Sequence, residues 1–168
     1  MSQAMKTYQP TCSIEALKAR AEMYHKIRQF FDERNVLEVE TPVLSQAAVT
    51  DVHLASVQVQ RHIHGKLNTQ YLQTSPEFPM KRLLASGSGA IYQICKVFRD
   101  DEHGRKHNSE FTMLEWYRVG ADYIALMDDT MAVLRLAVQA AGTATLAYRG
   151  MICDPALPPE RLTVAEAV

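Results

Sequence analysis

The chain has 168 residues, of which 47% are hydrophobic, so it can bury a core and is not a disordered segment. Its formal net charge of −1 excludes the basic excess that is typical of a duplex-binding module. Three widely spaced cysteines fit neither a disulfide framework nor a CxxC zinc site, so we expect reduced thiols in a cytoplasmic protein. We expect no signal peptide and no membrane span, because no apolar run approaches ~20 residues.

The first elements in chain order are an arm, a helix and a strand. Residues 1–12 are predicted to be irregular. Ser13 can cap a helix over residues 14–34, in which apolar positions recur with a helical period. Residues 36–40 alternate between apolar and acidic side chains, which indicates a strand, and Pro42 ends it because proline cannot donate to a ladder.

A strand is predicted over residues 57–63, with a turn at 65–66 and a second strand near 71–72. His62 and His64 are two positions apart and could share a metal, but no third ligand is evident and solvent-facing side chains are the better expectation. Ser75, Pro76 and Glu77 are typical of a helix start, with a serine cap, proline in the first position and an acid in the first turn; the helix should end at Gly87.

Two strands over residues 90–99 and 110–119, joined by a polar connection, are predicted to form a long hairpin. Asp122 caps a helix that ends at Gly142, and residues 161–167 begin another. The split between period-two and period-3.6 segments predicts an α/β fold of the α+β type. The strands expected in one mostly antiparallel sheet, flanked by helices, are those at 36–40, 57–63, 90–99 and 110–119.

Period-two alternation places an unusual set of side chains on one face of this hairpin. An aromatic ring, a carboxylate and a phenol suit a pocket in which the ring stacks on a flat ligand. Arg99 ends its strand, and its planar fork matches phosphate oxygens. Nearby acids could accept from an adenine amino group. The residues expected on this face are Gln93, Cys95, Val97 and Arg99 from one strand and Phe111, Met113, Glu115 and Tyr117 from the other.

These residues alone leave a plainer interpretation open. Arg99 could be a surface arginine that pairs with Asp101, which would contribute little to stability. The charged connection could be a solvated tip, and Glu115 and Tyr117 could form an exposed face.

Three segments resemble the class II aminoacyl-tRNA synthetases. Phe98 to Tyr117, with its His107-Asn108-Ser109-Glu110-Phe111 stretch, is similar to motif 2 in its lysyl form. The helix at 14–34 and the strand that leads to Pro42 resemble motif 1, which implies a homodimer. Thr74 to Leu84 resembles the amino-acid-binding segment. The resemblance implies that residues 13–168 form the N-terminal part of a catalytic domain whose mostly antiparallel sheet is flanked by helices.

Within this family, the amino-acid sequence at 49–53, 85–87 and 115–118 is similar to that of free-standing lysyl-synthetase paralogues. These enzymes activate (R)-β-lysine with ATP as an adenylate and transfer it to a lysine of elongation factor P. No anticodon-binding domain precedes motif 1, so tRNA is not an expected partner. The alternatives are a lysyl-tRNA synthetase catalytic core that charges tRNA, and a truncated, inactive binding module.

The resemblance also implies roles for individual residues. Arg99 would bind the ATP α-phosphate as the catalytic residue, and Phe111 would stack on adenine. Glu77 would meet a substrate ammonium. The other residues implied to contact ATP are Asp100, Asp101, Glu102, His107 and Asn108, with Asp101 or Glu102 reading adenine; those implied to line the substrate site are Ser75, Pro76, Glu115 and Tyr117.

Motif 3, which supplies a second ATP-binding arginine and metal-binding acids, is not found in the chain. The expected Mg²⁺ therefore has its ligands outside these residues, and the sequence as it stands is not expected to complete adenylation.

Overall fold

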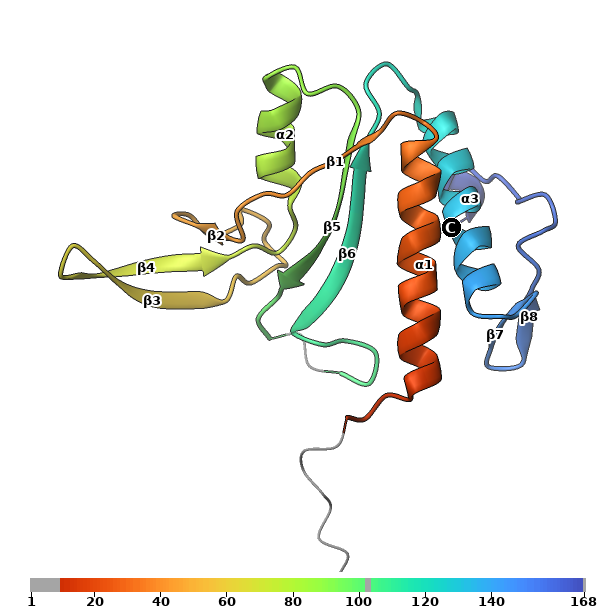
Figure 1. Ribbon diagram of the computed structural model, residues 1–168, viewed down its shortest axis with the longest axis horizontal. Coiled ribbons are helices and arrows are strands. Elements are labelled where there is room, and N and C mark those ends of the chain that lie inside the picture. Colours follow the sequence, from red (N-terminus) through yellow and green to blue (C-terminus); the bar gives the residue numbers. More distant parts are fainter. Residues whose placement is uncertain (1–9, 102–103, 168) are drawn as a thin grey trace, which may run out of the picture. The chain divides into compact units, whose positions relative to one another are not determined.

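The computed structural model of the protein describes residues 10–101 and 104–167, in which helices alternate with short paired strands (Figure 1). The chain divides into two units. One comprises the chain up to Phe30 together with the segment from Ala121 onward, and the other comprises Phe31–Gly120. Their architecture is mixed α/β with mostly antiparallel sheets, as predicted.

The main sheet of the Phe31–Gly120 unit has the order β1-β5-β6. Its hairpin consists of β5 (Ile91–Phe98) and β6 (Glu110–Tyr117), which pair antiparallel along their whole lengths, from Ile91 opposite Tyr117 to Phe98 opposite Glu110. This confirms the predicted long hairpin. The short strand β1 (Leu37–Glu38) pairs with β5 in parallel.

A second, antiparallel sheet has the order β2-β4-β3, with β2 at Leu44–Ser45, β3 at Gln58–Ile63 and β4 at Lys66–Leu72. The expectation of a single sheet is therefore wrong for the strand at 57–63. The physical reason lies just after β1, where Pro42 cannot continue the ladder and the chain leaves the first sheet. Period-two alternation identifies a strand but not its partner.

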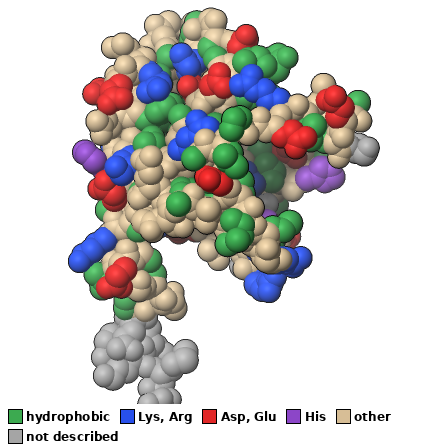
Figure 2. Space-filling model, turned by 90° about the vertical axis from the view of Figure 1, so that its right-hand side faces the viewer, with side chains coloured by type: hydrophobic (Ala, Val, Ile, Leu, Met, Phe, Trp, Pro, Cys, Tyr) green, Lys and Arg blue, Asp and Glu red, His purple; other side chains and the backbone are tan. Residues whose placement is uncertain are grey.

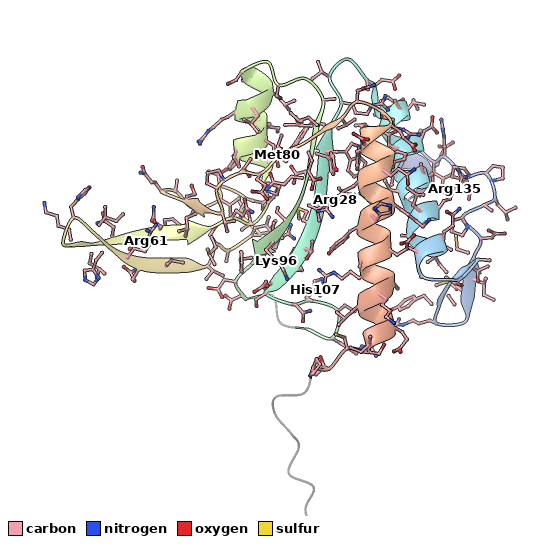
Figure 3. The ribbon with its side chains drawn as sticks, viewed as in Figure 1. Arg28, Arg61, Met80, Lys96, His107 and Arg135 are labelled. Atoms are coloured by element: carbon pink, nitrogen blue, oxygen red, sulfur yellow. The ribbon has the colours of Figure 1, made fainter. Side chains whose placement is uncertain are left out.

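The core of this unit centres on β5, which is covered on both sides. Ile91 and Val97 are fully buried, and Phe31 stacks on Tyr92 with ring centroids 4.4 Å apart. Trp116 lies on the face of β6 opposite to Glu115 and Tyr117, and its ring centroid is 5.8 Å from that of Phe31. Met80, which is fully buried, lies on α2 (Glu77–Ala85) beside the sheet (Figure 3).

The unit formed by the chain up to Phe30 and from Ala121 onward contains most of α1 (Ile14–Asp32), whose last two residues belong to the Phe31–Gly120 unit. It also contains α3 (Tyr123–Ala140) and the short α4 (Val164–Ala167). It also holds the two-stranded sheet β7 (Leu146–Tyr148) and β8 (Met151–Cys153). Arg135 of α3 donates from Nε to the Pro155 carbonyl at 2.6 Å, which ties the segment after β8 to the helix (Figure 3).

The predicted capping residues of α1 and α3 are confirmed. Ser13 Oγ accepts from the Ala16 amide at 3.1 Å, and an Asp122 carboxylate oxygen accepts from the Ala125 amide at 2.9 Å. No helix in the described part of the chain is long and apolar enough to cross a bilayer. On the face shown in Figure 2, acidic and basic side chains are interspersed among hydrophobic ones.

Two adjoining phenylalanines near the end of α1 are both buried, so neither ring is available for a dimer partner. Phe30 and Phe31 are 6% and 0% exposed. The apolar residues that α1 does leave exposed are Ile14 and Leu17, at 57% and 45%.

Replacement of Ile91 by alanine should lower the free energy of unfolding by about 2–5 kcal/mol, because it leaves a cavity beneath the central strand. The matched change Leu67→Ala, on a strand of the same unit but 64% exposed, should stay within about 0.5 kcal/mol of the parent. Urea denaturation followed through the fluorescence of the single tryptophan measures both. Equal losses for the two variants would contradict this description of the core.

Candidate active site

The predicted pocket face is assembled by the register of the hairpin. Gln93 lies opposite Glu115, Cys95 opposite Met113, and Val97 opposite Phe111. The two sets of side chains inferred from alternation are therefore rungs of one face. Val97 is buried beneath it, whereas Glu115 is only partly covered. This arrangement provides an apolar floor with polar groups toward one end.

The start of α2 contributes Ser75 to this face. Its hydroxyl accepts from the Glu77 amide at 3.1 Å and donates to Glu115 Oε2 at 2.6 Å. The helix itself begins at Glu77, with Pro76 in the N-cap position, so the prediction that proline occupies the first helical position is wrong by one residue. Because Pro76 has no side-chain donor or acceptor, the serine before it supplies the capping oxygen.

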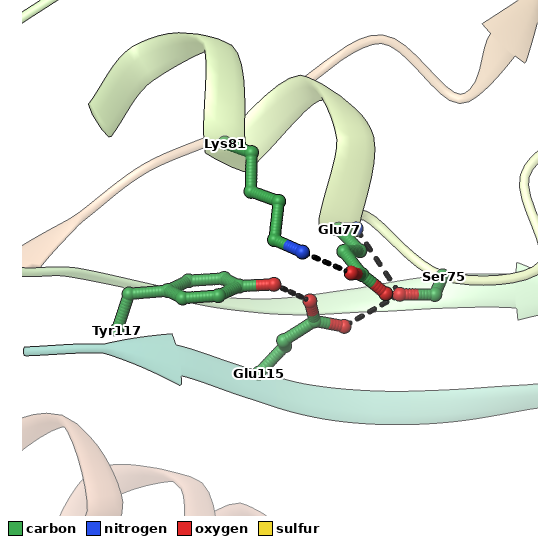
Figure 4. A network of polar contacts seen from close by, with 5 residues as sticks. All are labelled: Ser75, Glu77, Lys81, Glu115 and Tyr117. Atoms are coloured by element: carbon green, nitrogen blue, oxygen red, sulfur yellow. Dashed lines mark hydrogen bonds and ion pairs between the residues drawn. The ribbon is translucent and has the colours of Figure 1, made fainter. Parts of the chain in front are cut away.

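Glu115 is held on its other oxygen by Tyr117, whose hydroxyl donates to Oε1 at 2.6 Å (Figure 4). Burial raises the pKa of the Tyr117 phenol above its usual range, and the hydrogen bond to Glu115 and the charges of Glu115 and Glu77 raise it further. The phenol therefore stays a hydrogen-bond donor at neutral pH. Both oxygens of Glu115 are thus held by neutral hydroxyl groups.

Glu77 lies on the opposite side of the Ser75 hydroxyl from Glu115 and forms an ion pair with Lys81, one helical turn later (Figure 4). The side chains of Glu77 and Lys81 are 46% and 57% exposed. Such an exposed pair contributes little to stability and can be opened at small cost. The site therefore presents two carboxylates, one pinned by hydroxyls and one paired with a displaceable ammonium.

Arg99 and Phe111 meet at the other end of the hairpin. The guanidinium carbon lies 5.2 Å from the centre of the Phe111 ring, and Nε donates to the Thr74 carbonyl at 3.4 Å. The Arg99 amide donates to the Ser109 carbonyl at 2.9 Å, which continues the pairing past the end of the strands. A cationic fork and an aromatic ring, expected from sequence to act on one nucleotide, are thus neighbours.

The remaining predicted ATP contacts lie in the connection between the strands. Asp100 forms a bridge with Ala55 through its amide, and Asp101 is exposed with a φ of 57°. His107 and Asn108 are exposed, and the His107 amide donates to the Gly104 carbonyl at 3.1 Å. Glu102 lies outside the described residues. The four described residues of this set thus lie in the connection that follows β5 and precedes β6.

Several polar residues of the site were missed in the sequence. Thr41 donates to Gln93 Oε1 at 3.0 Å, and Gln73, 8% exposed, donates from Nε2 to the Lys96 carbonyl at 2.9 Å. Gln93 was expected on this face, but Thr41 and Gln73 were not; a polar Gln73 directly after an apolar strand end was the one sequence signal for its role. The Glu77–Lys81 pair was also readable, from its spacing of four on a helix.

Comparison with known proteins agrees with this geometry. The family described as tRNA synthetases class II (D, K and N) matches residues 3–168. Among relatives, the elongation factor P–(R)-β-lysine ligase of Vibrio atlanticus is 50% identical over 152 residues, which cover 88% of this chain and 46% of the relative. The enzyme of the same name from Vibrio cholerae is 53% identical over 144 residues, covering 84% of this chain and 44% of the relative.

The chain therefore spans about half the length of the curated relatives that it matches. The family match covers both the hairpin with Arg99 and Phe111 and the α2 segment with Ser75 and Glu77. On this ground the chain belongs to the class II tRNA synthetase family that comprises the D, K and N enzymes.

Proposed function

We propose that this chain carries the ATP and amino-acid sites of a cytoplasmic ligase that activates (R)-β-lysine and transfers it to a lysine of elongation factor P. The names of relatives about 50% identical to it support this reading. The observation that carries it is the grouping of Glu77 and Glu115 around Ser75, whose hydroxyl donates to the Glu115 carboxylate and accepts from the Glu77 amide (Figure 4).

A lysine-like substrate brings two ammonium groups, and the site offers a carboxylate for each. Glu115, with Tyr117 and Ser75 fixing its two oxygens, suits one ammonium in a partly desolvated position. Glu77, at the edge of α2, suits the other, which would take the place of the Lys81 ammonium. Pro76, which is fully buried, separates Ser75 from Glu77 in the chain.

The nucleotide end of the site suits ATP. Phe111 offers a ring face for adenine, and the Arg99 fork beside it matches an α-phosphate. Asp100, Asp101, His107 and Asn108 border this region, and Glu102 belongs to the same connection in sequence. Mg²⁺, which neutralises phosphate charge when bound, is expected on ligands outside this chain.

The proposed reaction is adenylation followed by aminoacyl transfer. The substrate carboxylate attacks the α-phosphorus in line, the bond to the β-phosphate breaks, and pyrophosphate leaves. The neutral amine of the acceptor lysine then attacks the adenylate carbonyl, and AMP leaves as an amide forms. Arg99 stabilises charge at the phosphate, and the two carboxylates hold the substrate in place, so positioning and electrostatics supply the catalysis. A homodimer through α1 stays a prediction.

Replacing either carboxylate should raise the KM for the amino acid, and the increase should be larger for Glu115, which is the more buried of the two. In a chimera in which this chain replaces the matching part of the Vibrio cholerae relative, Glu77→Gln should raise the KM for (R)-β-lysine about tenfold and Glu115→Gln about a hundredfold, with the KM for ATP nearly constant. Pyrophosphate exchange measures both constants. A larger effect from the exposed Glu77 than from Glu115 would contradict these assignments.

Arg99 should show the opposite pattern. Arg99→Ala should lower kcat/KM for ATP by roughly a hundredfold and change the KM for the amino acid little, because the fork acts on the phosphate. Arg99→Lys keeps the charge but loses the bidentate fork, so its kcat/KM for ATP should lie between those of the parent and of Arg99→Ala. Efficient charging of tRNA by the same chimera, in a parallel assay, would overturn the choice of elongation factor P as the acceptor.

Lys81→Met should strengthen the binding of (R)-β-lysine to the 168-residue chain, because the substrate ammonium no longer has to compete with Lys81 for the Glu77 carboxylate. The gain should reach at most about fivefold, since an exposed pair at this spacing contributes up to about 1 kcal/mol. Arg82→Met, the next residue on the same helix, is the matched control and should change nothing. Isothermal titration measures the affinities. Weaker binding by Lys81→Met would mean that Lys81 orients Glu77 instead of competing with the substrate.

A further inference from the structure

The β3–β4 hairpin is a projecting arm of the Phe31–Gly120 unit (Figure 1). Its six paired positions run from Gln58 opposite Tyr71 to Ile63 opposite Lys66. The third strand, β2, covers only Tyr71 and Leu72 at the base. From the pair of Gln60 and Thr69 outward, the arm therefore consists of two strands with most of their side chains exposed. Burial of a core does not account for so long an extension.

The arm carries positive charge without compensation. Between Asp51 and Glu77 the sequence contains no acidic residue, whereas Arg61 and Lys66 both lie on the hairpin. Arg61 donates to the neutral Gln70 side chain at 2.7 Å, and neither cation forms an ion pair within the described residues. Four cations elsewhere in the described residues form ion pairs, namely Lys26 with Glu22, Lys81 with Glu77, Lys96 with Glu110 and Arg161 with Asp128. The arm is therefore locally positive, although the chain as a whole has a formal net charge of −1.

The two cations share one face of the arm. Arg61 and Ile63 are two positions apart on β3, so their side chains lie on the same face, and Lys66 lies directly opposite Ile63. Figure 3 shows Arg61 on this arm, away from the core. The other face presents Leu67, 64% exposed, opposite His62. The tip thus combines positive charge with exposed apolar side chains, a composition that suits a protein partner better than a phosphate backbone, since duplex binders make roughly 6–10 phosphate contacts.

The arm is also joined directly to the candidate active site. β4 ends at Leu72, and Ser75 follows three residues later. Between them, the Gln73 carbonyl accepts from the Phe98 amide at 2.9 Å and the Gln73 amide donates to the Val43 carbonyl at 3.0 Å, so the connection is held on both sides. With seven residues in β4, the tip lies about 20 Å from the base at roughly 3.3 Å per residue. An acceptor protein that presents a lysine to the site could be contacted at this range.

We propose that the β3–β4 hairpin docks the acceptor protein by contacting an acidic surface that flanks its target lysine. The inference rests on the proposed function and adds to it a second contact, remote from the chemistry. Complementary charge at such a distance accelerates encounter and fixes orientation, and its effect is screened by salt. The arm therefore contributes to the choice of acceptor and not to amino-acid activation.

The test uses fluorescently labelled elongation factor P as the probe and the 168-residue chain as its partner. The double change Arg61→Glu with Lys66→Glu should weaken binding at least tenfold at low salt and remove most of its salt dependence. The neutral pair Arg61→Gln with Lys66→Gln should fall between this variant and the parent. Fluorescence anisotropy measures the affinities, and circular dichroism checks that each variant is folded.

The chain offers a matched control. The β7–β8 hairpin turns through Arg149 and Gly150 with φ of 50° and 81°, and the β3–β4 hairpin turns through His64 and Gly65 with φ of 50° and 74°. Both are two-residue turns that need positive φ at each central position. Arg149→Glu reverses one charge at an equivalent tip and should leave binding of elongation factor P unchanged, whereas either single reversal, Arg61→Glu or Lys66→Glu, should weaken it.

Three results would overturn the inference: no binding of elongation factor P by the parent chain, equal loss with Arg149→Glu, or no loss in the hairpin variants. Tighter binding of a homopolymeric RNA, lost in the same variants, would also overturn it by assigning the arm to nucleic acid. A non-hydrolysable lysyl-adenylate analogue, titrated against the same proteins, tests the proposed function separately. The hairpin variants should bind this analogue as the parent does, and its failure to bind the parent would count against the proposed function alone.

Discussion

The register of β5 against β6 is the constraint on which the candidate site depends. It sets Gln93 against Glu115 and Val97 against Phe111, so one face receives the carboxylate, the phenol and the aromatic ring together. Because side chains alternate with a period of two, a slip of one residue would send this set to the opposite face and bring Trp116 into its place. The buried Ile91 and Val97 and the stacking of Phe31 on Tyr92 oppose such a slip, since each would lose its packing.

A single hydroxyl then links the hairpin to the helix that completes the site. Ser75 accepts from the first turn of α2 and donates to Glu115 on β6, residues that are 40 positions apart in sequence. The same oxygen thus satisfies a helix terminus and orients a carboxylate. This double use explains why the segment before α2 has a serine followed by a rigid proline: the two residues set both where the helix starts and where the hydroxyl points.

The elements and the site were predictable to different degrees. Strongly periodic segments such as 14–32 and the β5–β6 hairpin followed from their apolar spacing, and the caps at Ser13 and Asp122 from side-chain chemistry. The partition into two sheets did not follow, because Pro42 marks the end of β1 without indicating which strands pair later. Long-range contacts escape local patterns in the same way.

The pocket residues illustrate this limit. Alternation placed Glu115 and Tyr117 on one face, and the motif resemblance assigned them to the substrate. Neither indicated that the two would bond to each other, or that Ser75 would hold the second oxygen, because such contacts require the folded arrangement of α2 over β6. A polar Gln73 beside an apolar strand was a signal, but its partner could not be predicted, since its hydrogen bond reaches across to a carbonyl of another strand.

The way in which Glu115 is held also bears on which charged groups it can attract. Hydroxyl groups occupy both of its oxygens but bring no positive charge, and within the described residues no cation forms an ion pair with it. Glu77 nearby is already paired with the Lys81 ammonium, so among the described residues Glu115 is the one of the two carboxylates without a cationic partner. A ligand carboxylate placed beside Glu115 would be repelled, whereas a ligand ammonium would find an acceptor that two hydroxyl groups already hold in position. Neutral donors thus orient this carboxylate without neutralising its charge.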